Sequence, residues 1–297
     1  MHRVLAELFS DTVAPVPLPP PPTEVRRIFG GALAAEVEEY FEHGAHVAPG
    51  DVVLDVGANI GAFAGAVATR TQGDVTLHCF EPAAPLFDTL RSNFRRHPLL
   101  ARTRHALHPV ALSTREDDGR ERAFYYFRHL PTDSTYDLER KLDAFRDTVR
   151  RAARALEGSE RDGWLRQRGG RSLARVLDWL CRDESRLGPW MAERVAGLET
   201  LRCRLASLER FAAQHELPRI DLLKIDVEGA ELDVLRGVGD AWPRVRRVVV
   251  ETDRREGRER AVIELLTAHG LRVTSCRPPR VAADGDRSLL VICASRG

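Results

Sequence analysis

The 297-residue sequence contains only two lysines, Lys141 and Lys224, among its 45 basic residues. The remaining basic residues are arginines, which we interpret as codon bias in a GC-rich genome; a specific use of guanidinium groups is the alternative. Net charge is also nearly absent, since 45 basic residues stand against 44 acidic ones. A protein that coats nucleic acid carries a broad surface of one sign, so we expect no nucleic-acid partner.

Cysteine is scarce and forms no recognisable pattern. There is no CxxC pair and no spacing of His and Cys that suits a structural zinc ion, so we expect no metal site of this kind. An odd number of cysteines without a secretory leader is typical of a reducing compartment, and we expect a cytoplasmic protein. No hydrophobic run reaches the roughly 18 residues of a membrane-spanning helix, so we expect no membrane partner. The five cysteines are Cys79, Cys181, Cys203, Cys276 and Cys293.

The N-terminal part is rich in proline. Residues 15–22 read PVPLPPPP, which favours an extended polyproline II conformation and excludes a helix or an inner strand. We interpret residues 1–30 as a segment with a stiff spacer; a ligand for a proline-recognising partner is the alternative. Next, apolar residues between 33 and 41, Tyr40 among them, recur at helical spacing and predict an amphipathic helix that ends before Pro49.

From residue 51 onward, short β-branched runs alternate with helical patterns. This alternation predicts an α/β fold with a mostly parallel sheet and right-handed crossovers. The last two strands are separated only by a loop rich in Pro, Gly and Asp, which predicts an antiparallel pair at one edge. Strands are expected at 51–56, 75–82, 103–113, 121–128, 218–229, 244–253, 271–276 and 287–294, and helices at 61–70, 83–97, 230–238 and 258–270.

A stretch of different texture interrupts this alternation. Residues 132–198 carry hydrophobic stripes at three- and four-residue steps and predict a helical insertion between two parts of the main domain, 31–131 and 199–297. Between residues 139 and 182 twelve basic residues outnumber seven acidic ones. The insertion is interpreted as a lid that recognises the substrate, or as a surface for an acidic carrier protein that bears a tethered intermediate; two solvated helices are the simpler alternative.

The most informative segment is 55–61, DVGANIG, where a buried strand turns into a helix. Gly57 and Gly61 leave the backbone bare, so that a ligand can approach the helix N-terminus. Glu81 closes the second strand, where a carboxylate can accept both ribose hydroxyls of an adenosine. Together the turn and Glu81 indicate a cofactor that contains adenosine.

The spacing of the glycines distinguishes between two cofactors that contain adenosine, NAD and S-adenosyl-L-methionine. A dinucleotide fingerprint is GxGxxG, but here Gly57, Gly61 and Gly65 are spaced by four, and Asn59 takes the place of the middle glycine. Asp55 also suits a cationic ligand better than a pyrophosphate. The pattern therefore favours S-adenosyl-L-methionine over NAD.

The motifs VVLDVGANIGAF, FEP, HPVALS, IDLLKIDVEGAELDVLRGV and VVVETD, in this order, resemble the FkbM family of SAM-dependent methyltransferases. The resemblance implies a class I methyltransferase (Rossmann-like) fold, with a seven-stranded mostly parallel sheet and an antiparallel edge strand. It also implies methyl transfer to an oxygen of a small molecule or sugar. By motif, it places Asp55, Gly57, Asn59 and Gly61 around the methionine part of the cofactor, Glu81 on the ribose, and Val110 and Ala111 against the adenine.

Acidic residues follow two neighbouring strands. Asp226 and Glu228 come after LLKI, and Glu251 and Asp253 end the VVV strand. Since ligands of open α/β sheets bind beyond the carboxyl ends of the strands, we expect these acids at the cofactor crevice and assign catalysis to Asp226, Glu228 and Glu251. The alternatives are a helix cap and, by analogy, a Mg²⁺ site. Lys224 shares a strand face with Asp226 and is either a paired core lysine or a polarising residue.

Four further residues lie near the expected site. His129 lies just before the insertion and is proposed as a base for a hydroxyl acceptor. His108 lies beside the expected adenine loop and is interpreted as a packing residue. Asp133 and Ser134 either contact the acceptor or form a polar turn.

The sequence thus predicts a SAM-dependent O-methyltransferase for a small molecule, such as a natural product or a sugar; an acceptor tethered to a carrier protein is the alternative. A NAD-type oxidoreductase and a catalytically silent module with the same fold are the rival hypotheses. The acceptor itself and the oligomeric state do not follow from the sequence.

Overall fold

The computed structural model describes residues 31–129, 134–143, 146, 192–193, 196–278 and 289–297. The chain divides into two compact units, one of residues 1–10 with 125–200 and one of residues 11–124 with 201–297. The proline-rich spacer and most of the expected helical insertion fall outside the described residues. The second unit holds the main sheet and the residues after its strands.

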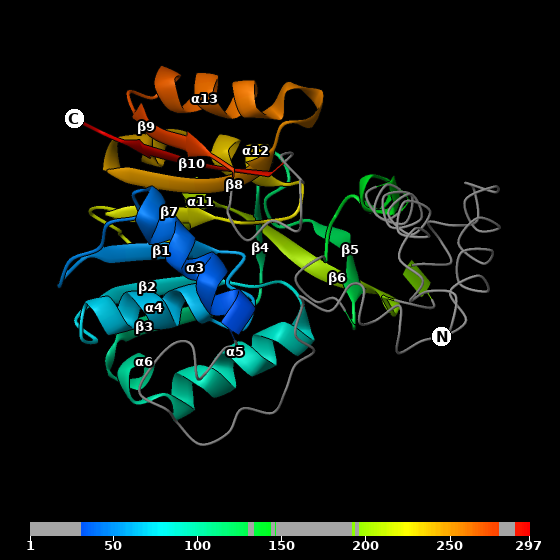
Figure 1. Cartoon of the computed structure of the whole chain (residues 1–297), viewed down its shortest axis with the longest axis horizontal. Helices are drawn as coiled ribbons and strands as arrows, with labels where there is room; N and C mark the ends of the chain where they lie inside the picture. Colours follow the sequence, from blue (N-terminus) through cyan, green and yellow to red (C-terminus); the bar gives the residue numbers. More distant parts are fainter. Residues whose placement is uncertain (1–30, 130–133, 144–145, 147–191, 194–195, 279–288) are drawn as a thin grey trace, which may run out of the picture. The chain divides into compact units, whose positions relative to one another are not determined.

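Within the described residues, seven strands form the main sheet in the order β3-β2-β1-β7-β8-β10-β9, visible from bottom to top in Figure 1. The first five are parallel, and β10 runs antiparallel to both β8 and β9. The expected seven-stranded, mostly parallel sheet with an antiparallel pair at one edge is therefore confirmed. The strands are β1 Val52–Val56, β2 Thr76–Phe80, β3 Arg104–His108, β7 Leu222–Ile225, β8 Arg247–Asp253, β9 Arg272–Arg277 and β10 Leu289–Ser295.

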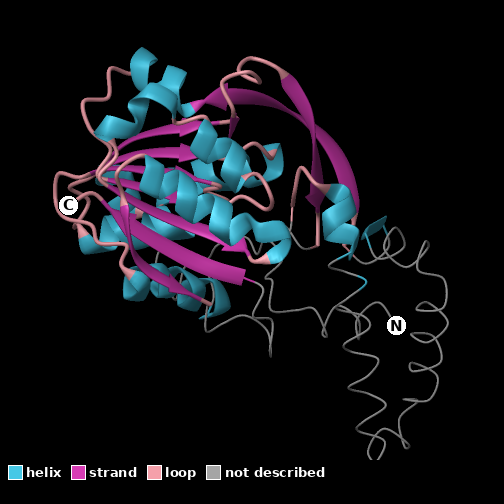
Figure 2. Ribbon diagram, turned by 90° about the horizontal axis from the view of Figure 1, so that it is seen from above, coloured by secondary structure: helices cyan, strands magenta, loops and turns pink. Residues whose placement is uncertain are grey.

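Helices cover both faces of this sheet (Figure 2). Because inner parallel strands are buried on both faces, successive residues of β1 enter different cores: Val53 packs with the α3, α4 and α5 side, and Leu54 with the α11, α12 and α13 side. The first face carries α3 Gly31–His43, α4 Ala62–Arg70, α5 Ala84–Arg96 and the short α6 Pro98–Arg102. The second carries α11 Leu208–Gln214, α12 Glu231–Arg236, α13 Arg258–Ala268 and 3-10 turns at Gly239–Arg244 and Arg255–Gly257.

A second, three-stranded sheet has the order β4-β6-β5. Its strands are β4 Ala111–Ser113, β5 Glu121–Phe127 and β6 Leu198–Ser207. The expectation of an outlying strand at 121–128 agrees with β5. Neither β6 nor α11 was expected, and β6 begins at the last residue assigned to the insertion. Residues 138–143 of the insertion are helical.

Candidate active site

The turn after β1 is held against the ends of two neighbouring strands. Gly57 N and Ala58 N donate to Phe80 O at 3.1 and 3.0 Å. Gly57 has φ +78°, and a Cβ there would lie 1.8 Å from the carbonyl oxygen of Asp226. Gly61 has φ +92°, and its Cβ would lie 2.8 Å from Leu90 Cδ1. The structure thus gives both glycines a reason within the fold, beyond the ligand approach inferred from the sequence.

Glu81 joins the end of β2 to this turn. Its Oε2 accepts from Asn59 N and its Oε1 from Ala83 N, each at 2.9 Å. The side chain is buried, and burial raises the pKa of Glu81 to about 7 despite the two backbone donors. The predicted partners Gly57, Asn59 and Glu81 therefore lie together.

Lys224 on β7 is the cation of the site. Its ammonium lies 3.1 Å from Asp55 Oδ1 and 3.3 Å from Asp226 Oδ2, and it donates to Gly57 O at 3.0 Å. Burial lowers the pKa of Lys224, but the carboxylates of Asp55 and Asp226 raise it by more, so the ammonium stays charged. Of its two predicted roles, pairing is the one observed. Asp55 is completely buried, and the ammonium group beside its carboxylate is that of Lys224.

Tyr40 on α3 connects the two predicted catalytic strands. Its hydroxyl lies 2.7 Å from Glu251 Oε2 and 3.1 Å from Asp226 Oδ2. One hydroxyl group thus contacts both the carboxylate that follows β7 and the carboxylate near the end of β8. The sequence placed Tyr40 in an apolar helical stripe and missed it as a site residue. The available signal was its hydroxyl, because a buried tyrosine needs a polar partner.

The other acids after these strands have different surroundings. Glu228 is half-buried in the turn between β7 and α12. Asp253 is buried and accepts from Arg255 N at 3.0 Å within its own turn. Glu231, which the sequence did not single out, accepts from Gly229 N at 2.8 Å and pairs with Arg258. It is therefore Asp226 and Glu251 that share a partner.

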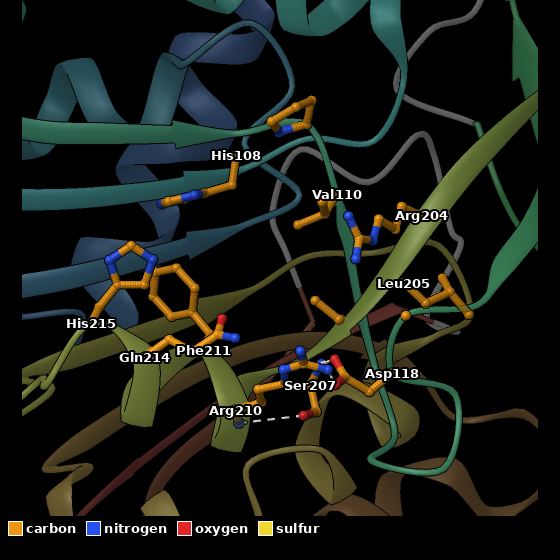
Figure 3. Close-up of a pocket in the computed structure, with 13 residues that line it drawn as sticks. His108, Val110, Asp118, Arg204, Leu205, Ser207, Arg210, Phe211, Gln214 and His215 are labelled. Atoms are coloured by element: carbon orange, nitrogen blue, oxygen red, sulfur yellow. Dashed lines mark hydrogen bonds and ion pairs between the residues drawn. The ribbon is translucent and has the colours of Figure 1, made fainter.

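The residues predicted near the adenine lie after β3. Ala111 is buried at the start of β4, where it pairs with Leu205 of β6. Val110 is half-buried and lines a cavity with His108 and Phe211 (Figure 3). His108 packs against Phe80 with a centroid distance of 4.8 Å, as its interpretation as a packing residue requires.

The remaining candidates belong to the first unit. His129 is exposed after β5 and its backbone N–H donates to Ala196 O at 3.0 Å. Ser134 Oγ accepts from Phe127 N at 3.1 Å, which is the polar-turn alternative for this residue. Asp133 lies outside the described residues. The roles predicted for the site residues stay predictions.

The described residues form neither a metal site nor a membrane-spanning helix. No set of three His, Cys, Asp or Glu side chains in the described part of the chain is arranged to hold a metal ion. None of the described helices is long and apolar enough to cross a membrane.

Comparisons with known proteins point to one family of methyltransferases. A family model described as the methyltransferase FkbM domain matches residues 55–273. The chain is 33% identical over 244 residues to the 31-O-demethyl-FK506 methyltransferase FkbM of Streptomyces tacrolimicus, with 82% of this chain and 81% of that protein covered. It is 30% identical over 226 residues to the methyltransferase sdnD of Sordaria araneosa, covering 76% and 75%. It is also 34% identical over 243 residues to the AMB antimetabolite synthetase AmbE of Pseudomonas aeruginosa, covering 80% of this chain and 10% of the synthetase.

Proposed function

Because the chain belongs to the FkbM family of S-adenosyl-L-methionine-dependent methyltransferases, we propose that it methylates a hydroxyl oxygen of a small molecule. The Streptomyces relative supports an oxygen acceptor, since its name describes a methyltransferase of 31-O-demethyl-FK506. The observation that carries the proposal is the carboxylate of Asp226, which is held next to the β1 turn by Lys224 and Tyr40.

The residues after β1 and β2 fit the adenosyl part of the cofactor. S-adenosyl-L-methionine, when bound, supplies a methyl group on a positively charged sulfur. Each carboxylate oxygen of Glu81 accepts one backbone N–H and retains a lone pair for a further donor. A buried carboxylate with a raised pKa is stabilised by added hydroxyl donors, and the two ribose hydroxyls are such donors. This supports Glu81 as the ribose ligand.

Asp226 and Glu251 are both partly exposed, and of these two Asp226 is the one that lies next to the β1 turn. Its side chain is 31% exposed, whereas that of Lys224 is 3% exposed. Among the described residues, Tyr40 and Lys224 both contact Oδ2. Oδ1 is therefore the atom that we assign to the proton of the acceptor hydroxyl, which must be lost as the oxygen bonds to the methyl carbon.

Tyr40 and Glu251 position this base. The Tyr40 hydroxyl is closer to Glu251 than to Asp226, and it separates two carboxylates that would otherwise repel each other. The orientation of Asp226 is fixed from one side by Tyr40 and from the other by the Lys224 ammonium. Alignment of acceptor and methyl group is the main task in this kind of displacement, so a fixed carboxylate is useful beyond its basicity.

The test uses paired acceptors that share a skeleton and differ in bearing a hydroxyl or an amine. With cofactor labelled by ¹³C at the methyl group, we expect a methoxy signal in the NMR spectrum of the product. Asp226→Asn should lower kcat by about 100-fold or more, in the range of general-base catalysis, with the Kd of S-adenosylhomocysteine unchanged within about twofold.

Asp233→Asn is the matched control, because Asp233 lies on α12 and pairs with the exposed Arg236. It should retain the wild-type kcat. An N-methyl product alone, or an Asp226→Asn variant as fast as the wild type, would contradict the proposal.

A second form of the acceptor, tethered to an acidic carrier protein, is supported by the excess of basic over acidic residues between residues 139 and 182. In this form the tethered acceptor should give a kcat/KM at least tenfold above that of the same acceptor free in solution. Equal values for the two would argue for a free small molecule.

A further inference from the structure

A cavity of about 380 Å³ lies between the end of β3, β6 and α11 (Figure 3). It is open to solvent on the side of the exposed Arg204 and Arg210, and its volume falls in the range of small-molecule pockets. Its lining comes from segments of the second unit alone. The proposed mechanism uses none of the charged or aromatic side chains that line it.

One wall of the cavity is aromatic. His108, Phe211 and His215 gather on one side in Figure 3, with ring centroids of Phe211 and His215 4.3 Å apart and those of His108 and Phe211 4.8 Å apart. Burial, together with the neighbouring His78 and His215, lowers the pKa of His108 to about 4. His108 is therefore neutral at pH 7, and this wall suits a planar aromatic ring.

The opposite wall carries two arginines, Arg204 and Arg210, and one carboxylate, Asp118. Asp118 accepts from Arg210 at 2.7 Å and from Ser207 N at 2.9 Å. Burial raises the pKa of Asp118, but these two donors and the nearby charge of Arg204 lower it by more, so this wall holds two positive charges against one negative charge. Arg204 is exposed and, among the described residues, makes no ion pair. The guanidinium group of Arg204 can thus bind the carboxylate of a ligand.

The cavity is separate from the cofactor turn. Asn59, Gly61 and Glu81 are not among its lining residues, and Gly61 leads into α4 on the other face of the sheet. Phe211 of α11 belongs to the core of the opposite face. Val110 is the predicted cofactor contact that does line it.

We propose that this cavity is a second small-molecule site that binds an aromatic monocarboxylate. The ring packs against His108, Phe211 and His215, and the carboxylate accepts from Arg204. The site lies outside the cluster of Asp226, Lys224, Tyr40 and Glu251 and shares Val110 with the predicted adenine contacts, so competition with S-adenosylhomocysteine distinguishes a second site from the cofactor site.

The test is calorimetric titration of the full chain with naphthalene-2-carboxylate as the probe and 2-naphthalenemethanol as its neutral counterpart. We expect the carboxylate to bind more tightly than the alcohol. Arg204→Gln should weaken the carboxylate at least tenfold and leave the alcohol unchanged. Phe211→Leu should weaken both probes, with folding checked by circular dichroism.

Arg202→Gln is the matched control, because Arg202 is exposed on the same strand, lies near Glu121 and does not line the cavity. It should bind the carboxylate within twofold of the wild type, and so should the wild type saturated with S-adenosylhomocysteine. The proposal is overturned if the folded wild type binds neither probe, if Arg202→Gln weakens binding as much as Arg204→Gln, or if S-adenosylhomocysteine displaces the carboxylate.

Discussion

At the scale of single residues, Tyr40 decides how the two predicted carboxylates coexist. Tyr40→Phe removes the hydroxyl that lies within 3.1 Å of both Asp226 and Glu251. Without this hydroxyl the Asp226 carboxylate loses one of the two groups that orient it, so kcat should fall about tenfold or more. The KM for the cofactor should stay unchanged. Phe41→Leu on the same helix is the control, and a Tyr40→Phe variant with the wild-type kcat would show that Tyr40 serves packing alone.

Glu81 gives a second prediction at this scale. Ribose hydroxyls can donate to the ionised carboxylate, whose pKa without cofactor is about 7. Binding of S-adenosylhomocysteine should therefore tighten as the pH rises from about 6 to about 8, because ionisation then costs less. Glu81→Gln should bind about tenfold more weakly at pH 8 and lose this dependence on pH. Calorimetry across this range measures both effects, and a wild type with a flat profile would place the ribose elsewhere.

Positions after strands were the residues that the sequence predicted best. Asp226 and Glu251 could be named because parallel strands end at one edge of a sheet, and the structure brings them to one hydroxyl. The sequence did not show which chain group would join them, since Tyr40 reaches the site from a helix 186 residues before Asp226. Contacts of such separation have no local signature.

At the scale of elements, β6 shows where a usable signal was overlooked. In this strand Cys203, Leu205 and Ser207 are buried, while Arg202 and Arg204 on either side of Cys203 are exposed. That alternation is typical of a half-buried strand. Because of these arginines the segment resembles the charged insertion that precedes it, and this resemblance hides the strand pattern.

The turn between β1 and α4 supports a prediction about an element junction. A Cβ at Gly57 would lie 1.8 Å from a backbone oxygen, which cannot move aside as a side chain can. Gly57→Ala should therefore lower the free energy of unfolding by more than about 4 kcal/mol or prevent folding.

Gly50→Ala is the control for Gly57→Ala. Gly50 has a similar φ of +83°, but nothing lies within 4 Å of its Cβ position. The control should cost about 1–2 kcal/mol, the strain of the left-handed backbone alone. Urea denaturation measures both variants, and equal costs would show that the β1 turn can move away from β7.

At the scale of the whole molecule, the class of fold followed from alternation, because β1, β2, β7 and β8 are each followed by a helix that the sequence predicts. The cavity did not follow, since its walls combine β3, the segment before β5, β6 and α11, and two of these elements were not predicted. The glycine spacing only favoured S-adenosyl-L-methionine over NAD, and the family match over residues 55–273 decides between them.

The pH dependence of folding is a property of the whole molecule that combines groups of opposite sign. The pKa of Glu81 is about 7 in the folded protein, above its ordinary value of 4.5. Its contribution to stability is present below pH 4.5 and lost as the pH rises through 7, by on the order of 3 kcal/mol. Burial lowers the pKa values of His78 and His108 to about 4 from 6.5. Their contribution is present above pH 6.5 and lost as the pH falls toward 4.

These two slopes overlap between about pH 4.5 and pH 6.5, so the wild type should be most stable within or near this interval when no cofactor is bound. Glu81→Gln should flatten the decline toward pH 8, and His78→Asn should reduce the decline toward pH 4. Urea denaturation at intervals of half a pH unit gives the free energy of unfolding for the three proteins. Curves that stay parallel across this range would mean that these buried groups keep their ordinary pKa values, and the raised pKa of Glu81 would then no longer support a site for ribose hydroxyls.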